Sequence, residues 1–206
     1  MIIQNVVGLP LTICWKDFGG NDRFVESILN SLAQQYLELF SHPFDRIGSL
    51  RLTPDGKSWE IGTSPISVDQ FDISQDGFKI TLSKPHTSSI DYYTSQTHLF
   101  KHWLNEQHNS VYDESDAIAK FLTREVFRCI IPHFVNEQLN NGPYFLFHLD
   151  LHATNVIVNH QFKIEAILDW EFTSAVPTQV EFSPPRSLMD QYEPDNMTLN
   201  SDNYNS

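Results

Sequence analysis

The spacing of apolar residues predicts three long helices. Apolar side chains recur every three or four positions from Asp22 to Phe40, the period of an amphipathic helix. A second helix is predicted from Ser88 or Ser89, either of which can cap it, to about His108. A third is predicted from Glu114 to Leu139, disturbed near Pro132 because proline cannot donate a helical hydrogen bond. Helices therefore account for much of the expected structure.

Short apolar runs between turn residues predict small antiparallel hairpins. Residues 47–52 and 59–61 flank the turn sequence PDG, and residues 156–158 and 163–168 flank a short polar turn. An apolar aromatic run at 143–147 is suited to a buried strand just before the second hairpin. Together with the helices, these strands predict a mostly helical α+β protein.

Composition narrows the function classes. The formal net charge of −13 argues against a nucleic-acid partner, because phosphates would be repelled. The apolar opening lacks a basic region, contains Pro10 and is too short to span a bilayer, so we interpret it as structure and expect no membrane partner. Cys14 and Cys129 have neither metal-ligand spacing nor a disulfide framework, which favours a reducing compartment and a cytoplasmic location.

The segment HLDLHATN, from His148 to Asn155, carries the candidate chemistry together with Asp169, fourteen residues after Asn155. Phosphoryl transfer mainly requires a positioned hydroxyl and a cation on the nucleotide phosphates. Asp150 would accept the proton of the attacking hydroxyl, and the oxygens of Asn155 and Asp169 would bind magnesium. A hairpin between the two segments would bring Asp169 back beside Asn155, closing a metal site from two loops.

These residues resemble the aminoglycoside phosphotransferase and choline kinase-like family, in particular its fungal branch. The resemblance rests on GPYFLFHLDLHATNVIV and ILDWEF, and upstream on FDRIGSL, HTSSIDYY and DESDA. It covers roughly residues 5 to 190. It implies a kinase-like fold, ATP with Mg²⁺, and a small-molecule hydroxyl acceptor. An acidic protein is compatible with a cationic acceptor, although an acidic solvated surface is common in any soluble protein.

The resemblance is confined to the C-terminal lobe of such kinases. No glycine-rich phosphate loop is visible, and Lys79 is the nearest match to their strand lysine. The resemblance therefore implies one C-terminal-lobe domain over residues 1–190, with a polar, disordered tail over 191–206 and no N-terminal lobe. The surface left by that lobe would expose apolar residues near the start of the chain and favour self-association.

Two histidines have supporting roles in this interpretation. His148 would orient the loop by a hydrogen bond from its ring to nearby backbone, and His152 would either touch substrate phosphate or face solvent. Two features depart from the family. Leu149 replaces the usual glycine, and the turn Asn159-His160-Gln161 lacks one, although asparagine tolerates positive φ.

Two other functions stay open at this point. A truncated, catalytically inactive kinase-like fragment would act as a binding or regulatory module. Alternatively, His148, Asp150 and His152 lie at alternate positions and would form part of a metal-hydrolase ligand set, for which imidazole suits zinc or iron. The pair His98 and His102 lacks the glutamate of the zinc-protease pattern and is expected on a solvated helix face.

Overall fold

The computed structural model describes residues 6–18, 20–66, 84–107 and 110–181. These residues form an α+β structure with two antiparallel sheets. They divide into two compact units, the first within Met1–Gln34 and Leu151–Leu168, the second within Gln35–Asp150 and Asp169–Phe182. Most of the polar stretch 64–85 and all of the predicted tail 191–206 lie outside the described residues.

The first unit contains a three-stranded sheet and the start of a long helix. Strands β1 (Leu9–Pro10), β5 (Val156–Val158) and β6 (Ile164–Ile167) form an antiparallel sheet in the order β1-β5-β6. Helix α1 (Leu11–Phe18) follows β1 directly, and helix α2 (Asp22–Phe40) has the bounds that its periodicity predicts. The β5–β6 hairpin is likewise the one predicted from the apolar runs.

Helix α2 is held against the β5–β6 hairpin by its buried face and by two hydrogen bonds. Phe24, Ile28 and Leu32 are buried one helical turn apart. The Ser27 hydroxyl donates to the Phe162 carbonyl at 3.0 Å, and the Ser31 hydroxyl accepts from the Ile164 amide at 3.0 Å. These bonds satisfy backbone groups at the far end of the hairpin and fix the hairpin on the helix.

The turn of the β5–β6 hairpin differs from the prediction. Asn159 does not take the positive φ; its side-chain oxygen instead accepts from the Gln161 and Lys163 amides at 2.8 and 3.1 Å. Phe162 has φ 59°, a rare conformation for a bulky residue. Its ring lies edge-on to the Phe24 ring, with centroids 5.0 Å apart, so tertiary packing holds it there.

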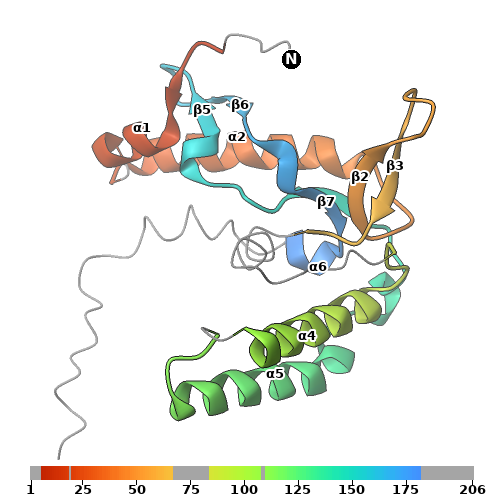
Figure 1. Ribbon diagram of the computed structural model, residues 1–206. Helices are drawn as coiled ribbons and strands as arrows, with labels where there is room; N and C mark the ends of the chain where they lie inside the picture. Colours follow the sequence, from red (N-terminus) through yellow and green to blue (C-terminus); the bar gives the residue numbers. More distant parts are fainter. Residues whose placement is uncertain (1–5, 19, 67–83, 108–109, 182–206) are drawn as a thin grey trace, which may run out of the picture. The chain divides into compact units, whose positions relative to one another are not determined.

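The second unit contains a four-stranded antiparallel sheet in the order β3-β2-β7-β4. The predicted hairpin of β2 (Gly48–Leu52) and β3 (Trp59–Thr63) forms one side, as Figure 1 shows, and Gly56 supplies the positive φ of its turn. Strand β4 (Phe145–His148) is the predicted aromatic strand. Strand β7 (Thr173–Val176) lies between β2 and β4 and pairs with both. This strand was not predicted.

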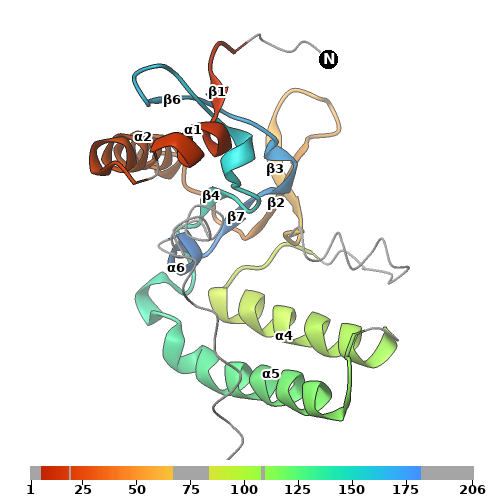
Figure 2. The same ribbon diagram turned by 90° about the vertical axis from the view of Figure 1, so that its left-hand side faces the viewer.

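Helices α4 (Ser89–Glu106) and α5 (Glu114–Phe134) pack side by side within the second unit (Figures 1 and 2). Ser88 caps α4, as predicted, by accepting from the Asp91 amide at 3.1 Å. Helix α5 ends at Phe134, two residues after Pro132, so the predicted helical stretch to Leu139 is too long. A short 3-10 turn, Glu137–Leu139, follows.

A hydrophobic core joins this helix pair to the sheet. One buried cluster contains Tyr93, Ile131 and Val135 from the helix pair and the cap of α5, and another contains Tyr144 with Ile47, Ile61 and Ala175. Tyr92 packs against both clusters. The short helix α6 (Thr178–Glu181) completes the described elements. Within the described residues, no helix has the length and apolar character that crossing a membrane requires.

Candidate functional site

The antiparallel pairing of β4 and β7 places Asp150 and Asp169 at one end of the sheet. Strand β4 ends at His148, whose register partner Thr173 begins β7. In an antiparallel pair, the loop that leaves one strand and the loop that enters the other lie at the same end. Asp150 follows His148 by two residues and Asp169 precedes Thr173 by four. Both carboxylates therefore belong to loops at this end of the β4–β7 pair.

His148 fixes the peptide that carries Asp150. Its side chain is buried, 2% exposed, and its Nδ1 accepts a hydrogen bond from the Asp150 amide at 3.2 Å. The ring thus contacts nearby backbone as predicted, but as the acceptor and not the donor. An Nδ1 that accepts this bond leaves Nε2 as the ring nitrogen that can donate.

Asp169 has a left-handed backbone, with φ 62° and ψ 58°. This conformation is uncommon outside glycine, although aspartate tolerates it better than bulky residues do. The elements on the C-terminal side of Asp169 are well anchored: the Trp170 ring lies edge-on to the His148 ring at 5.0 Å, and Thr173 enters the sheet. Backbone strain of this kind clusters at functional sites, which makes Asp169 a candidate functional residue.

Asn155 lies in the first unit, at the end of a 3-10 turn (Ala153–Asn155) that leads into β5. Its carbonyl accepts from the Leu168 amide at 2.7 Å, and its own amide donates to the His152 carbonyl at 2.9 Å. Val156 pairs with Ile167, so Asn155 and Leu168 flank the same end of the β5–β6 hairpin. Asp169 is the next residue in the chain, and its return beside the Asn155 side chain stays a prediction.

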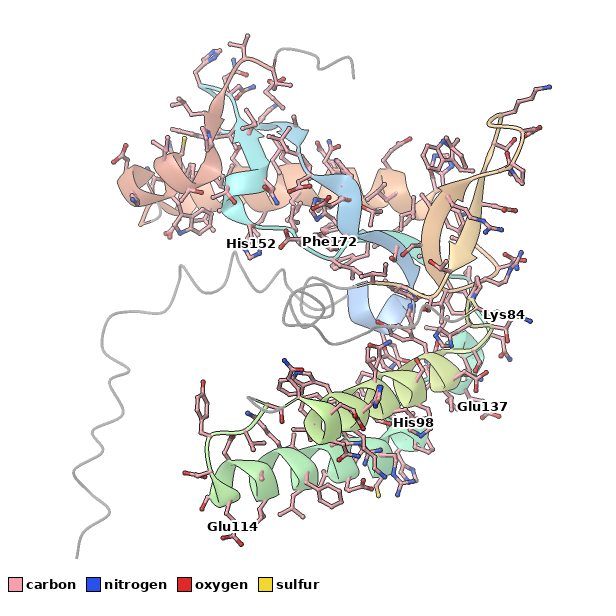
Figure 3. The ribbon with its side chains drawn as sticks, viewed as in Figure 1. Lys84, His98, Glu114, Glu137, His152 and Phe172 are labelled. Atoms are coloured by element: carbon pink, nitrogen blue, oxygen red, sulfur yellow. The ribbon has the colours of Figure 1, made fainter. Side chains whose placement is uncertain are left out.

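His152 is exposed in the loop between β4 and β5 (labelled in Figure 3). Exposure fits either of the roles expected for it, so its contact with a phosphate stays a prediction. Leu149, which replaces the family's glycine, is half-buried in the turn after β4. The turn therefore accommodates the leucine side chain while the His148 ring still bonds to the Asp150 amide.

The described residues form no group of three or more His, Cys, Asp or Glu side chains suited to holding a metal ion. The hydrolase set of His148, Asp150 and His152 is therefore not assembled as such a group there. Magnesium has different requirements, because it is commonly bound by one or two carboxylates plus waters and substrate phosphates. The magnesium site expected from the sequence therefore stays a prediction.

Thr173 is a candidate residue that the sequence reasoning missed. Its hydroxyl is buried, and among the described residues it has no hydrogen-bond partner. It stands directly opposite His148 in the β4–β7 register, on the same face of the sheet. A buried hydroxyl without a partner costs free energy and is often explained by function. The sequence did not indicate Thr173, because its position opposite His148 depends on strand β7, which was not predicted.

A strand lysine for the nucleotide phosphates is not seen in the described part of the chain. Six of the seven lysines are described, and none lies on a strand. Lys79, the candidate from the sequence, lies outside the described residues. His98 and His102 are both exposed on α4, as expected for a solvated helix face.

Comparisons of the chain with protein-family models, with curated proteins and with solved structures found no match. The resemblance to the phosphotransferase family and the kinase-like fold that it implies therefore stay predictions. The residues at the end of the β4–β7 pair and their contacts remain as the structural support for a function.

Proposed function

We propose that this protein is an ATP-dependent phosphotransferase that phosphorylates a hydroxyl group of a small molecule. One observation carries the proposal: Asp150 and Asp169 lie in loops at the same end of the β4–β7 pair, and His148 bonds to the Asp150 amide. Phosphoryl transfer depends on positioning and electrostatic stabilisation, so a base on a held peptide and a second carboxylate at the same end of the sheet support this function.

In this proposal Asp150 acts on the acceptor. Its carboxylate accepts the proton of the acceptor hydroxyl as the oxygen attacks the γ-phosphorus of ATP. A new bond forms between that oxygen and phosphorus, the bond from phosphorus to the bridging oxygen breaks, and ADP leaves with the electron pair. The buried His148 ring supports the step by holding the Asp150 peptide in one orientation.

Asp169 and Asn155 are the proposed magnesium ligands. Carboxylate and amide oxygens suit this hard cation, and the oxygen donors of both residues fit it. Magnesium held by these oxygens would supply positive charge to the phosphate oxygens. The left-handed backbone of Asp169 supports a functional role for this residue, because strain is retained where a side chain must be aimed in one direction.

The acceptor is proposed only by class. The chain's net charge of −13 suits a cationic small molecule with a hydroxyl group, since unlike charges raise the rate of encounter. Fold and loop chemistry do not carry acceptor identity. A cytoplasmic location, where ATP and magnesium are abundant, is part of the same proposal.

Thermal unfolding of the whole chain, titrated with Mg·ATP, tests the nucleotide half of the proposal. A ligand that binds only the folded state raises its stability by RT ln(1 + [L]/Kd), about 2.7 kcal/mol at 100 times Kd. We expect a saturable rise in melting temperature that EDTA abolishes and that Asp169→Ala loses. Asp45→Ala, the same change at a carboxylate that is 85% exposed and remote in sequence, should keep the full rise.

Three outcomes would redirect the proposal. No rise at millimolar Mg·ATP would contradict it. A magnesium-dependent rise without any phosphate release would favour the alternative of a kinase-like binding module. A third outcome is that elemental analysis of the purified protein finds zinc or iron and that Asp169→Ala keeps the full rise in melting temperature. This result would favour the hypothesis of a metal hydrolase that uses His148, Asp150 and His152.

A further inference from the structure

Helix α4 carries two exposed histidines one helical turn apart. His98, labelled in Figure 3, and His102 are separated by four residues, and we call them the α4 histidine pair. On an α-helix, residues at this separation lie on one face with their Cβ atoms about 5–6 Å apart. The same spacing brings the two histidines of the zinc-protease pattern onto one metal ion. The pair therefore has the spacing of a two-nitrogen metal ligand.

The α4 histidine pair lies on the side of α4 that faces away from α5. Helix α4 packs on α5 through its buried residues Tyr93 and Thr97, of which Tyr93 contacts Ile131. At about 100° per residue, the middle of the pair is rotated by about 140° from the middle of Tyr93 and Thr97. Both histidines are exposed, so a solvated ion can reach their rings without any displacement of α5.

The backbone that carries the α4 histidine pair is well anchored. The Ser88 side chain caps the start of α4 by accepting from the Asp91 amide at 3.1 Å. In the middle of the helix, the buried Arg124 guanidinium of α5 donates to the Thr97 carbonyl at 2.7 Å. A helix held in this way keeps the two Cβ atoms at their spacing before any ion binds. Binding then requires only that two exposed rings turn, so little conformational entropy is lost.

The chemistry of imidazole selects the class of ion. Its nitrogen suits zinc, copper and nickel, whereas magnesium and calcium prefer oxygen ligands. The described residues form no metal-binding group of three or more His, Cys, Asp or Glu side chains, so the pair would act as two ligands only. A zinc ion takes four ligands, with nitrogen at about 2.0–2.1 Å. Water would fill the other two positions.

The charges around the α4 histidine pair favour a cation overall. Asp91 precedes His98 by seven residues and Glu106 follows His102 by four, so both exposed carboxylates lie on the same side of α4 as the pair. Lys101, also exposed, opposes them with one positive charge. The chain as a whole has a net charge of −13. A divalent cation is therefore attracted both locally and at long range.

We propose that the α4 histidine pair binds a divalent transition-metal ion of the zinc and copper class, through one imidazole nitrogen of each ring. The proposal is independent of the phosphotransferase function, whose magnesium would be held by oxygen ligands in other loops. It also differs from the metal-hydrolase alternative, which would use residues of the segment His148–His152. Within one family of ligands, copper should bind more tightly than zinc or nickel, as the general order of these ions predicts.

Calorimetric titration of the full chain with Zn²⁺, in excess Mg²⁺, tests the proposal. All variants carry Cys129→Ser, because an exposed thiol also binds zinc. We expect one saturable site that weakens on the order of 100-fold in His98→Ala and in His102→Ala, since either change removes the second attachment of a chelate. Alanine favours helix, and circular dichroism checks the fold. His42→Ala, at a histidine of the second unit that is 68% exposed, should keep full affinity.

A change of spacing tests whether the two rings act together. His102→Ala combined with Asn105→His keeps the number of histidines and uses another exposed position of α4. It places the two histidines seven residues apart, about 10.5 Å along the axis. Side chains of a helix all lean toward its N-terminus, so this distance is not closed and the rings do not converge on one ion. We expect the weak binding of His102→Ala. Zinc affinity equal to that of the unaltered pair would overturn the proposal.

Nuclear magnetic resonance of the histidine ring protons locates the bound ion. We expect the signals of His98 and His102, assigned from the alanine variants, to change together at less than one equivalent of Zn²⁺. Changes confined to His148 and His152 would place the metal in the loop after β4 and overturn the proposal in favour of the hydrolase alternative. A wild-type chain that takes up no zinc, or that binds it equally well in His98→Ala, would overturn it as well.

Discussion

Helices α2 and α5 have similar lengths and similar amphipathic patterns but different surroundings. Helix α2, of 19 residues, buries Phe24 and Ile28 and contacts the β5–β6 hairpin through its serines. Helix α5, of 21 residues, buries only Arg124 and Ile131 and leaves five apolar residues exposed at intervals of four: Ile118, Leu122, Val126, Ile130 and Phe134. Apolar periodicity therefore locates an apolar face on a helix, but it does not say what covers that face.

The largest expected effect concerns the covered face of α2. Phe24→Ala should destabilise the protein by about 3–5 kcal/mol, because a buried aromatic ring leaves a cavity when it is removed. Phe24 is 1% exposed and contacts the rings of Trp15 and Phe162 at 5.6 and 5.0 Å. Urea unfolding measures the change. Leu37→Ala on the same helix, at a residue 68% exposed, should change stability by less than about 0.5 kcal/mol.

Two neighbouring isoleucines of α5 allow the stability cost of a buried and of an exposed position to be compared. Ile131 is 1% exposed and Ile130 is 44% exposed, although both are isoleucines of one helix. Ile131→Ala should cost about 2–5 kcal/mol. Ile130→Ala should cost much less, because the Ile130 side chain is already largely exposed in the folded chain. Equal costs would show that Ile130 is covered in the folded protein.

A smaller effect is expected at the helix caps. Ser88→Ala removes the acceptor for the Asp91 amide at the start of α4 and should cost about 1 kcal/mol. Ser88→Asn, which supplies another capping oxygen, should restore most of the loss. The midpoint of urea unfolding, at unchanged slope, is the measurement. If both variants lose the same stability, the cap contributes by some means other than its hydrogen bond.

The smallest effect is a pH dependence from His86. Burial lowers the pKa of this ring below its ordinary 6.5, partly offset by Asp91. The unfolded chain then binds a proton more readily than the folded chain, so the contribution of His86 is fully present above pH 6.5 and is lost as pH falls below it. Melting temperatures measured at several pH values should fall on acidification, and His86→Gln should reduce that slope. An unchanged slope would exclude His86 as the cause.

The sequence predicted the elements whose signals are local. The bounds of α2, the Ser88 cap of α4, and the β2–β3 and β5–β6 hairpins agree with the structure because periodicity, caps and turn residues act over a few positions. Strand β7 was missed because TSAV is short and owes its conformation to pairing with β2 and β4, which are far away in the sequence. Such non-local pairing has no local signal.

The same limit applies to the candidate site. The residue types of HLDLHATN and ILDWEF indicated Asp150 and Asp169, and the structure places both in loops at one end of the β4–β7 pair. The acceptor role of His148, the left-handed backbone of Asp169 and the buried hydroxyl of Thr173 were not predictable, because each depends on tertiary packing around the loop. Likewise, the positive φ in the β5–β6 turn falls on Phe162 since Phe24 packs against its ring.

Phosphate release from ATP by the whole chain is the most direct test of the central claim that Asp150 serves as the base of a phosphotransferase. With saturating Mg·ATP and water as the acceptor, we expect measurable release that falls about 100-fold or more in Asp150→Ala, while the magnesium-dependent rise in melting temperature is retained. Release that is equal in Asp150→Ala and in the wild type, or absent from both, would contradict the claim.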